Sequence, residues 1–179
     1  MCIRDSHIAD QIPMKEALDI LQPLLTNPAV LKIAQNAKYD WQVLKAQGVE
    51  VSPIDDTMMI SYVLNAGNHG HGMDELSQRY LNHTPIPYKE VAGTGKSQVT
   101  FDMVSLDSAL NYAAEDADIT LRLWHILKPE LVRQRLITVY ERLERPLIGV
   151  IGRMEMAGIC VNRQTLKDMS NQFATDLGR

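Results

Sequence analysis

The sequence predicts an α/β fold in which helices outnumber strands. Two short apolar segments, 29–34 and 51–54, have the character of buried strands, and each is followed by a helical pattern. From residue 105 onward the apolar residues recur at helical spacing. Because two strands do not form a stable sheet alone, we expect further strands to precede residue 11 and the chain to be truncated at its N-terminus.

The N-terminal half alternates helical and apolar segments. The patterns predict, in order, a helix over 14–25, a strand over 29–34, a helix over 38–46, a strand over 51–54, and helices over 57–64 and 73–81. Asn36 stands where a side-chain cap would begin the second helix, and Gly48 ends that helix. Residues 82–100 contain prolines and glycines without periodicity, so we expect a long loop there.

The C-terminal half is predicted to be helical apart from one short strand. The pattern predicts a helix over 107–126, and Pro129 marks the start of the next helix because proline is tolerated in a first turn. This next helix is expected to reach Met156 with a bend at Pro146. Residues 159–161 favour a strand, and Asn162 is expected to cap a final helix.

Composition and length are those of an ordinary soluble protein. The chain has 179 residues, 45% hydrophobic and 22% charged, enough for one domain or for one domain plus the start of another. The sequence has no secretory signal and no apolar run near the roughly 18 residues that span a membrane. Its two cysteines have neither metal nor disulfide spacing, so we expect a cytoplasmic protein without a membrane partner. Residues 1–10 are interpreted as an uncertain or foreign segment.

The net charge of −4 does not indicate a nucleic-acid partner, since binders normally carry a basic surface. Aromatic residues make up only 6% of the chain, so stacking platforms for bases must be few. Charge is weak evidence against an enzyme that binds its substrate through metal ions, because the ions supply positive charge.

The most informative segment is YAAEDAD at residues 112–118, inside a predicted helix. Tyr112 and Asp116 are four residues apart and share a face, which Glu115 borders, while Asp118 points elsewhere. A carboxylate there can hold a metal ion while the phenol orients a water molecule. A solvated acidic face with a half-buried tyrosine explains the same pattern, so spacing alone leaves both interpretations open.

The second informative segment is NAKYD at residues 36–40, directly after a predicted buried strand. Asn36 and Asp40 are again four residues apart, at a strand end where α/β folds place ligands. An Asn cap followed by a surface Asp is an equally good interpretation of this segment taken alone.

Together, the two segments resemble the second and third motifs of the DEDD 3′→5′ exonucleases, in the subgroup with a tyrosine in the third motif. The resemblance implies a ribonuclease-H-like α/β fold in which four carboxylates hold two divalent ions, Mg²⁺ or Mn²⁺, at a nucleic-acid 3′ end. It assigns metal binding and catalysis to Asp40 and Asp116. It assigns the orientation of the attacking water to Tyr112, and contact with the terminal nucleotide to Asn36.

The other two carboxylates of that family belong to an Asp-x-Glu motif on an early strand. Neither Asp5 nor Asp10 is followed by Glu at the right offset. The chain is therefore expected to lack the N-terminal strands of the fold, to hold ions poorly, and to be inactive on its own.

From Gln11 onward the chain resembles the family A bacterial polymerases called DNA polymerase I. The matching landmarks are LKIAQNAKYD, IDDTMMISYVLN, GMDELSQRYL, AGTGKSQVTF, YAAEDADITLRL and ERPLIGVIGRMEMAGICVN. The resemblance implies a proofreading exonuclease domain over 11–128 and the start of a polymerase domain over 129–179. It further implies a monomer that acts on a single-stranded DNA 3′ end in replication and repair, with the nucleotidyltransferase activity in a C-terminal part outside this fragment.

The loop GTGKS at residues 93–97 superficially matches a phosphate-binding loop. Glu90 stands where that motif needs glycine, and no apolar strand precedes it. Under the polymerase resemblance, Lys96 contacts a DNA phosphate and Tyr88 stacks on a base. A loop aromatic packed on its own domain explains Tyr88 equally well.

Two other functions stay open from the sequence. A ribonuclease D-like RNA exonuclease would share the acidic motifs but carry a helical RNA-binding domain in place of the C-terminal landmark. A non-catalytic domain that binds single strands, or that only separates its neighbours, would need none of these carboxylates.

Overall fold

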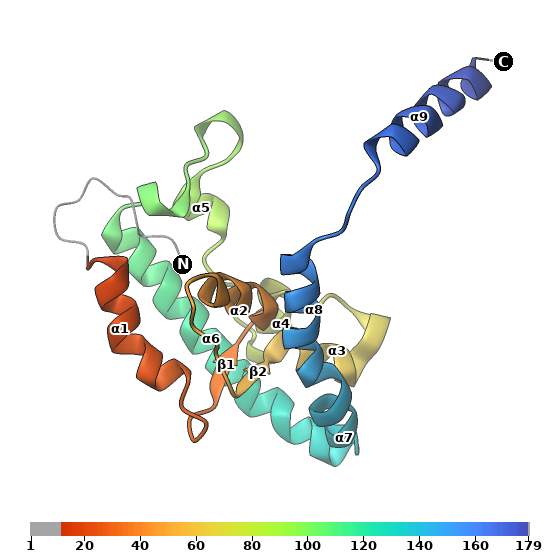
Figure 1. Ribbon diagram of the computed structural model, residues 1–179. Helices are drawn as coiled ribbons and strands as arrows, with labels where there is room; N and C mark the ends of the chain where they lie inside the picture. Colours follow the sequence, from red (N-terminus) through yellow and green to blue (C-terminus); the bar gives the residue numbers. More distant parts are fainter. Residues whose placement is uncertain (1–11, 179) are drawn as a thin grey trace.

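The computed structural model describes residues 12–178, and the expectation for residues 1–10 and the side chain of Lys96 lie outside what it describes. The helices and strands are α1 (Met14–Leu25), β1 (Lys32–Ala34), α2 (Ala37–Ala46), β2 (Ile54–Asp56), α3 (Thr57–Asn65), α4 (Met73–Leu81), α5 (Tyr88–Ala92), α6 (Leu106–Arg133), α7 (Ile137–Val139), α8 (Arg145–Ala157) and α9 (Arg163–Leu177). A π turn, Tyr140–Glu144, joins α7 to α8. Figure 1 shows these elements forming one body from which α9 projects.

The sheet consists of β1 and β2 in parallel, with Ile33 opposite Asp55. Both strands are displaced from the predicted ranges. The expected strand over 29–34 keeps only its last three residues, because a turn at Asn27, whose side chain accepts the Ala29 N–H at 2.9 Å, occupies its beginning. The expected strand over 51–54 instead runs over the acidic residues to Asp56.

Helix α6 is longer than predicted. It runs for 28 residues and passes through Pro129, where we expected a new helix to begin. An interior proline costs about 3 kcal/mol. The stripe Ile119, Leu123, Leu127 and Leu131 is buried along this helix, and each such side chain contributes roughly 1.5–3 kcal/mol. Burial of the stripe therefore outweighs the proline.

The helix expected over 129–156 does not begin at Pro129, because a turn at 134–136, where Arg135 has a left-handed backbone (φ 60°), separates α6 from the helical stretch that follows. Helical backbone continues from Ile137 to Ala157 through the π turn, which ends at Glu144, and Pro146 lies in the first turn of α8. The strand expected over 159–161 is absent, and Ile159 is 89% exposed without a neighbouring strand. Asn162 caps α9 as predicted, accepting the Thr165 N–H at 3.1 Å.

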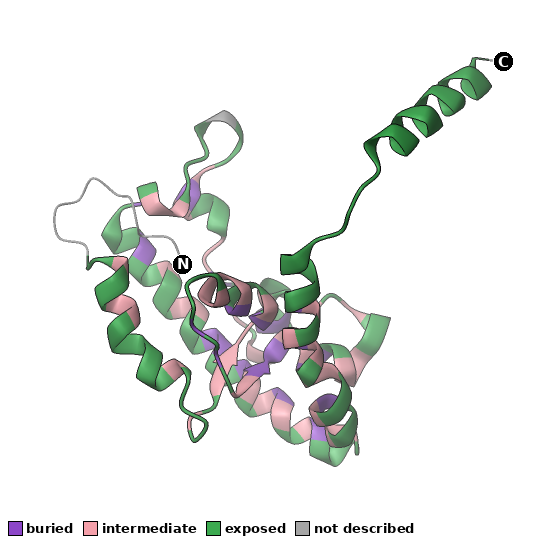
Figure 2. Cartoon of the chain, in the orientation of Figure 1, coloured by how far each residue is buried: buried purple, intermediate pink, exposed green. Residues whose placement is uncertain are grey.

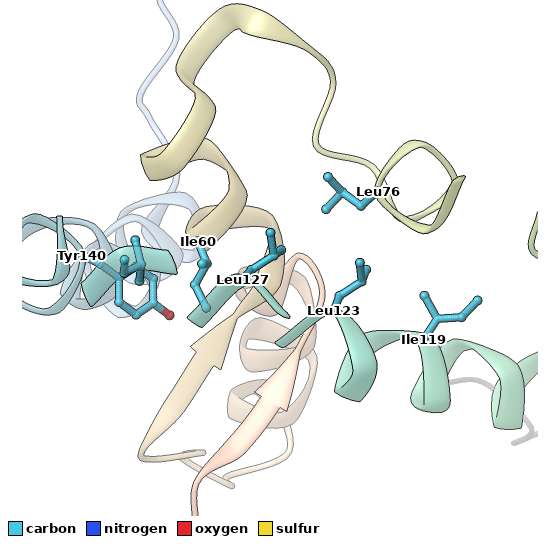
Figure 3. Close-up of a cluster of buried hydrophobic side chains, with 7 residues drawn as sticks. Ile60, Leu76, Ile119, Leu123, Leu127 and Tyr140 are labelled. Carbon is cyan, nitrogen blue, oxygen red and sulfur yellow. The ribbon is translucent and has the colours of Figure 1, made fainter. Parts of the chain in front are cut away.

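The main core lies between α3, α4, α6 and the π turn. Its buried members, shown in Figure 3, are Ile60, Leu76, Ile119, Leu123, Leu127, Leu131 and Tyr140. A second cluster joins α2 to α8, with Trp41 and Ile148 at its centre. Figure 2 shows that burial stops at α8, since α9 is exposed along its whole length. None of the described helices is both long and apolar enough to cross a membrane.

Candidate active site

The pair Tyr112 and Asp116 lies on one face of α6, one turn apart, and both side chains are half-buried. Burial, followed by the neighbouring Asp116 carboxylate, raises the pKa of Tyr112 to about 12. The phenol is therefore neutral at physiological pH, and its hydroxyl can both donate and accept hydrogen bonds.

The Asp116 carboxyl is in an environment that disfavours its negative charge. Burial raises its pKa, and the charges of Glu115 and Asp74 add to this effect, while Tyr112 opposes it. Asp74 reaches the pair from the first turn of α4. A cation would relieve the repulsion among these carboxylates.

Two further aromatic rings pack beside Tyr112. The ring of Tyr112 lies 6.1 Å from Tyr88 and 5.8 Å from Phe101, and Tyr88 and Phe101 are 6.4 Å apart. Tyr88 begins α5, a short helix inside the stretch that we expected to be a loop without helices. Tyr88 therefore packs on its own domain. Because it remains 41% exposed, part of its ring still faces solvent.

The second pair, Asn36 and Asp40, lies at the start of α2. Asn36 precedes the helix as predicted, but it has a left-handed backbone (φ 60°), and its side chain makes no capping hydrogen bond. The buried Asp56 takes over the cap, accepting the N–H groups of Asn36 at 3.0 Å and Ala37 at 2.9 Å. Asn36 and Asp40 are both exposed residues, although partial burial of its carboxyl raises the pKa of Asp40.

Asp56 is a carboxylate that the sequence did not single out. It also accepts the Met58 N–H at 2.9 Å, so one side chain caps α2 and α3 together. Burial raises its pKa against the opposing effect of these N–H groups. No local spacing reveals this role, because Asn36 and Asp56 are twenty residues apart.

The carboxylates of the two pairs come from different helices. Asp40 belongs to α2 and Asp116 to α6, and among residues 12–178 no three His, Cys, Asp or Glu side chains gather closely enough to hold a metal. Oxygen ligands are the right type for Mg²⁺ or Mn²⁺, but the described residues supply no group of three such side chains. Lys96 belongs to the short 3₁₀ turn Gly95–Ser97.

Comparison with known proteins gives this geometry a context. A family described as 3′–5′ exonuclease matches residues 4–132. DNA polymerase I of Rhizobium leguminosarum is 58% identical over 170 residues, covering 95% of this chain and 17% of that protein. DNA polymerase I of Pseudomonas aeruginosa is 38% identical, covering 93% of this chain and 19% of that protein.

One solved structure has a fold similar to that of this chain. It contains the POL domain of Pol1 from M. smegmatis in complex with a DNA primer-template and dNTP, and it matches 93% of this chain and 26% of its own with a TM-score of 0.70. At 21% identity this likeness concerns the fold alone. The chain spans 17–19% of the length of the two polymerases described above. Since the exonuclease match covers most of the sequence, the chain belongs to the 3′–5′ exonuclease family.

Proposed function

We propose that this chain contributes part of an active site that removes the 3′-terminal nucleotide from a DNA strand. The observation that carries the proposal is the Tyr112–Asp116 pair, half-buried on one face of α6 within the exonuclease match. The Tyr112 ring also contacts the rings of Tyr88 and Phe101, which fix its orientation beside Asp116.

In this proposal Asp116 and Asp40 are metal ligands, and the bound Mg²⁺ or Mn²⁺ ions supply an activated water and charge neutralisation. Tyr112 acts through its neutral hydroxyl, which orients the attacking water by hydrogen bonding and does not remove its proton. The raised pKa of Tyr112, about 12, supports this role over that of a phenolate base.

The remaining predicted residues would hold the DNA end. Asn36, exposed at the start of α2, would contact the terminal nucleotide. Tyr88 would stack a base on the exposed part of its ring. Lys96 would contact a DNA phosphate. We therefore expect the affinity of Lys96→Ala for DNA to depend less strongly on salt concentration.

We propose that the larger protein is a DNA polymerase I. This segment would take part in proofreading during replication and repair. Residues 11–128 would belong to the exonuclease domain and residues 129–179 to the start of the polymerase domain, in a monomeric cytoplasmic enzyme. The sequence contains no Asp-x-Glu triplet for the first exonuclease motif. We therefore expect the chain on its own to leave DNA undigested.

A chimera tests this proposal. The chain replaces its matching 170-residue segment in the Rhizobium leguminosarum polymerase, to which it is 58% identical. We expect Mg²⁺-dependent digestion of a DNA 3′ end, lost in Asp116→Asn and retained in Asp118→Asn. Asp118 is the matched control because it is exposed and, among residues 12–178, forms an ion pair only along its own helix, with Arg122 at 3.3 Å.

The alternatives make different predictions in the same assay. A ribonuclease D-like enzyme would digest RNA in preference to DNA. A non-catalytic single-strand-binding domain would bind the DNA but leave both substrates intact. A structural domain would neither bind the DNA nor digest either substrate. Digestion of DNA that survives Asp116→Asn would contradict the proposed role of Asp116.

A further inference from the structure

Glu115 sits next to Asp116 in the acidic run, but its carboxylate faces a different part of the molecule. One oxygen lies 2.7 Å from His83 Nε2, and the other accepts the Ile86 N–H at 2.6 Å. The Glu115 side chain is only 19% exposed. Both oxygens therefore contact the segment that contains His83 and Ile86.

The segment that Glu115 binds leads directly to Tyr88. It begins after Asn82, whose left-handed backbone (φ 51°) ends α4, and the His83 carbonyl is held by the Ser77 hydroxyl at 2.9 Å. Prolines on either side of Ile86 restrict the backbone. Fixing the Ile86 N–H therefore fixes the direction in which α5 starts.

The consequence is a defined position for the Tyr88 ring. Tyr88 comes two residues after Ile86, and its ring lies 6.1 Å from that of Tyr112. Glu115 thus attaches the base-stacking candidate to the same turn of α6 that presents Asp116. The Ile86 N–H, and to a smaller degree His83, hold the pKa of Glu115 below its ordinary value, so the carboxylate is ionised at neutral pH.

We propose that Glu115 is a positioning residue that holds Tyr88 against Tyr112 and thereby sets the affinity of the site for a DNA 3′ end. The proposal rests on the proposed exonuclease function. Glu115 would act through the 83–88 segment without touching the reacting atoms. Its loss should raise KM and leave kcat close to that of the unsubstituted enzyme.

The first experiment measures digestion of single-stranded DNA by the chimera. We expect Glu115→Ala to raise KM by roughly tenfold, with kcat changed less than about twofold. Glu115→Gln keeps an acceptor for Ile86 and should recover most of the affinity. Asp118→Asn, the neighbouring exposed carboxylate, should have no effect.

A double-mutant cycle shows whether Glu115 works through Tyr88. Tyr88→Ala should raise KM as Glu115→Ala does, and the double variant should be no worse than Tyr88→Ala alone. Additive effects would overturn the proposal, because Glu115 would then act elsewhere. A fall in kcat to the level of Asp116→Asn would also overturn it and make Glu115 part of the catalytic machinery.

A second measurement on the chain itself does not depend on nuclease activity. With 3-fluorotyrosine incorporated, the Tyr88 fluorine resonance, assigned through Tyr88→Phe, should move toward its unfolded position in Glu115→Ala and stay in place in Asp118→Asn. An unmoved resonance would overturn the positioning contact. If Asp116→Asn did not reduce digestion by the chimera, the proposed exonuclease function and the effect of Glu115 on substrate affinity would both be overturned. The fluorine measurement would still show whether Glu115 positions Tyr88.

Discussion

Gly152 of α8 packs directly against the ring of Trp41 on α2. A Cβ atom at position 152 would lie 2.8 Å from Cε3 of the indole. Trp41 is only 3% exposed, so its ring has little room to move aside. Nearby, Glu155 accepts a hydrogen bond from Gln42 at 2.8 Å and pairs with Lys38. The helix that carries Asn36 and Asp40 at its start is thus held in place by residues beyond the exonuclease match, which ends at 132.

Gly152→Ala is expected to destabilise the fold by about 1–3 kcal/mol through overpacking. The matched control is Gly149→Ala on the same helix, where the added Cβ meets only the flexible end of Arg153 at 3.3 Å. That control should stabilise the helix by up to about 1 kcal/mol. Urea denaturation followed by circular dichroism measures both variants, and equal stabilities would show that the Trp41 contact is unimportant.

Tyr140→Phe is expected to lower the free energy of unfolding by about 1–3 kcal/mol. The buried Tyr140 hydroxyl donates to Asp55 Oδ1 at 3.1 Å and accepts the Asp56 N–H at 3.1 Å, so its removal leaves both groups without this partner. Tyr62→Phe, at an exposed tyrosine, should change stability by less than about 0.5 kcal/mol. Thermal unfolding that does not distinguish the two variants would contradict this account.

Asp116→Asn is expected to stabilise the chain while removing the proposed activity. Burial raises the pKa of Asp116 in the folded state, so the folded state loses stability as the pH rises through that pKa. At neutral pH the asparagine variant should melt roughly 1–2 °C higher. Well below the ordinary value of 3.8 both carboxyl and amide are neutral, so the difference in melting temperature should vanish there. A difference that persists in acid would point to another cause.

Tyr112→Phe is expected to reduce kcat in the chimera on the order of 10²-fold, the scale of a misoriented reactant. The ring contacts with Tyr88 and Phe101 should survive, so the melting temperature should change little. Because the pKa of Tyr112 is about 12, the unsubstituted chimera should show no rate change from this phenol across roughly pH 6–10. A titration within that range that disappears in Tyr112→Phe would identify the tyrosine as a base.

Signals that act within one segment were sufficient to predict α1, α4 and the Tyr112–Asp116 pair. Each depends on spacing along a single helix. The strand expected over 159–161 had suitable residues, but strands also require a neighbour. Pro129 is a strong local signal that the buried leucine stripe of α6 overrides.

Interactions between distant residues could not be predicted from one sequence. Asp55 is fully buried in β2, where its oxygens meet Trp124 Nε1 at 2.8 Å, Lys128 Nζ at 2.9 Å and Arg145 Nε at 3.1 Å. Those partners lie 69 to 90 residues later in the chain. Without them, an acidic residue argues against a buried strand, and the prediction therefore ended β2 too early.

Helix α6 is one long, continuous element, so a change of its orientation at one end moves the residues at the other. Its 28 residues extend about 42 Å at 1.5 Å per residue. Lys128, bonded to Asp55 and Glu141, lies near one end, and Tyr112 lies roughly 24 Å away toward the other. A tilt of about 5° around the Lys128 end would displace Tyr112 by about 2 Å, and a misplacement of even about 1 Å can reduce a catalytic rate about 10²-fold. Ion pairs far from the proposed site therefore contribute to its alignment, together with the packing of α6 against α3 and α4.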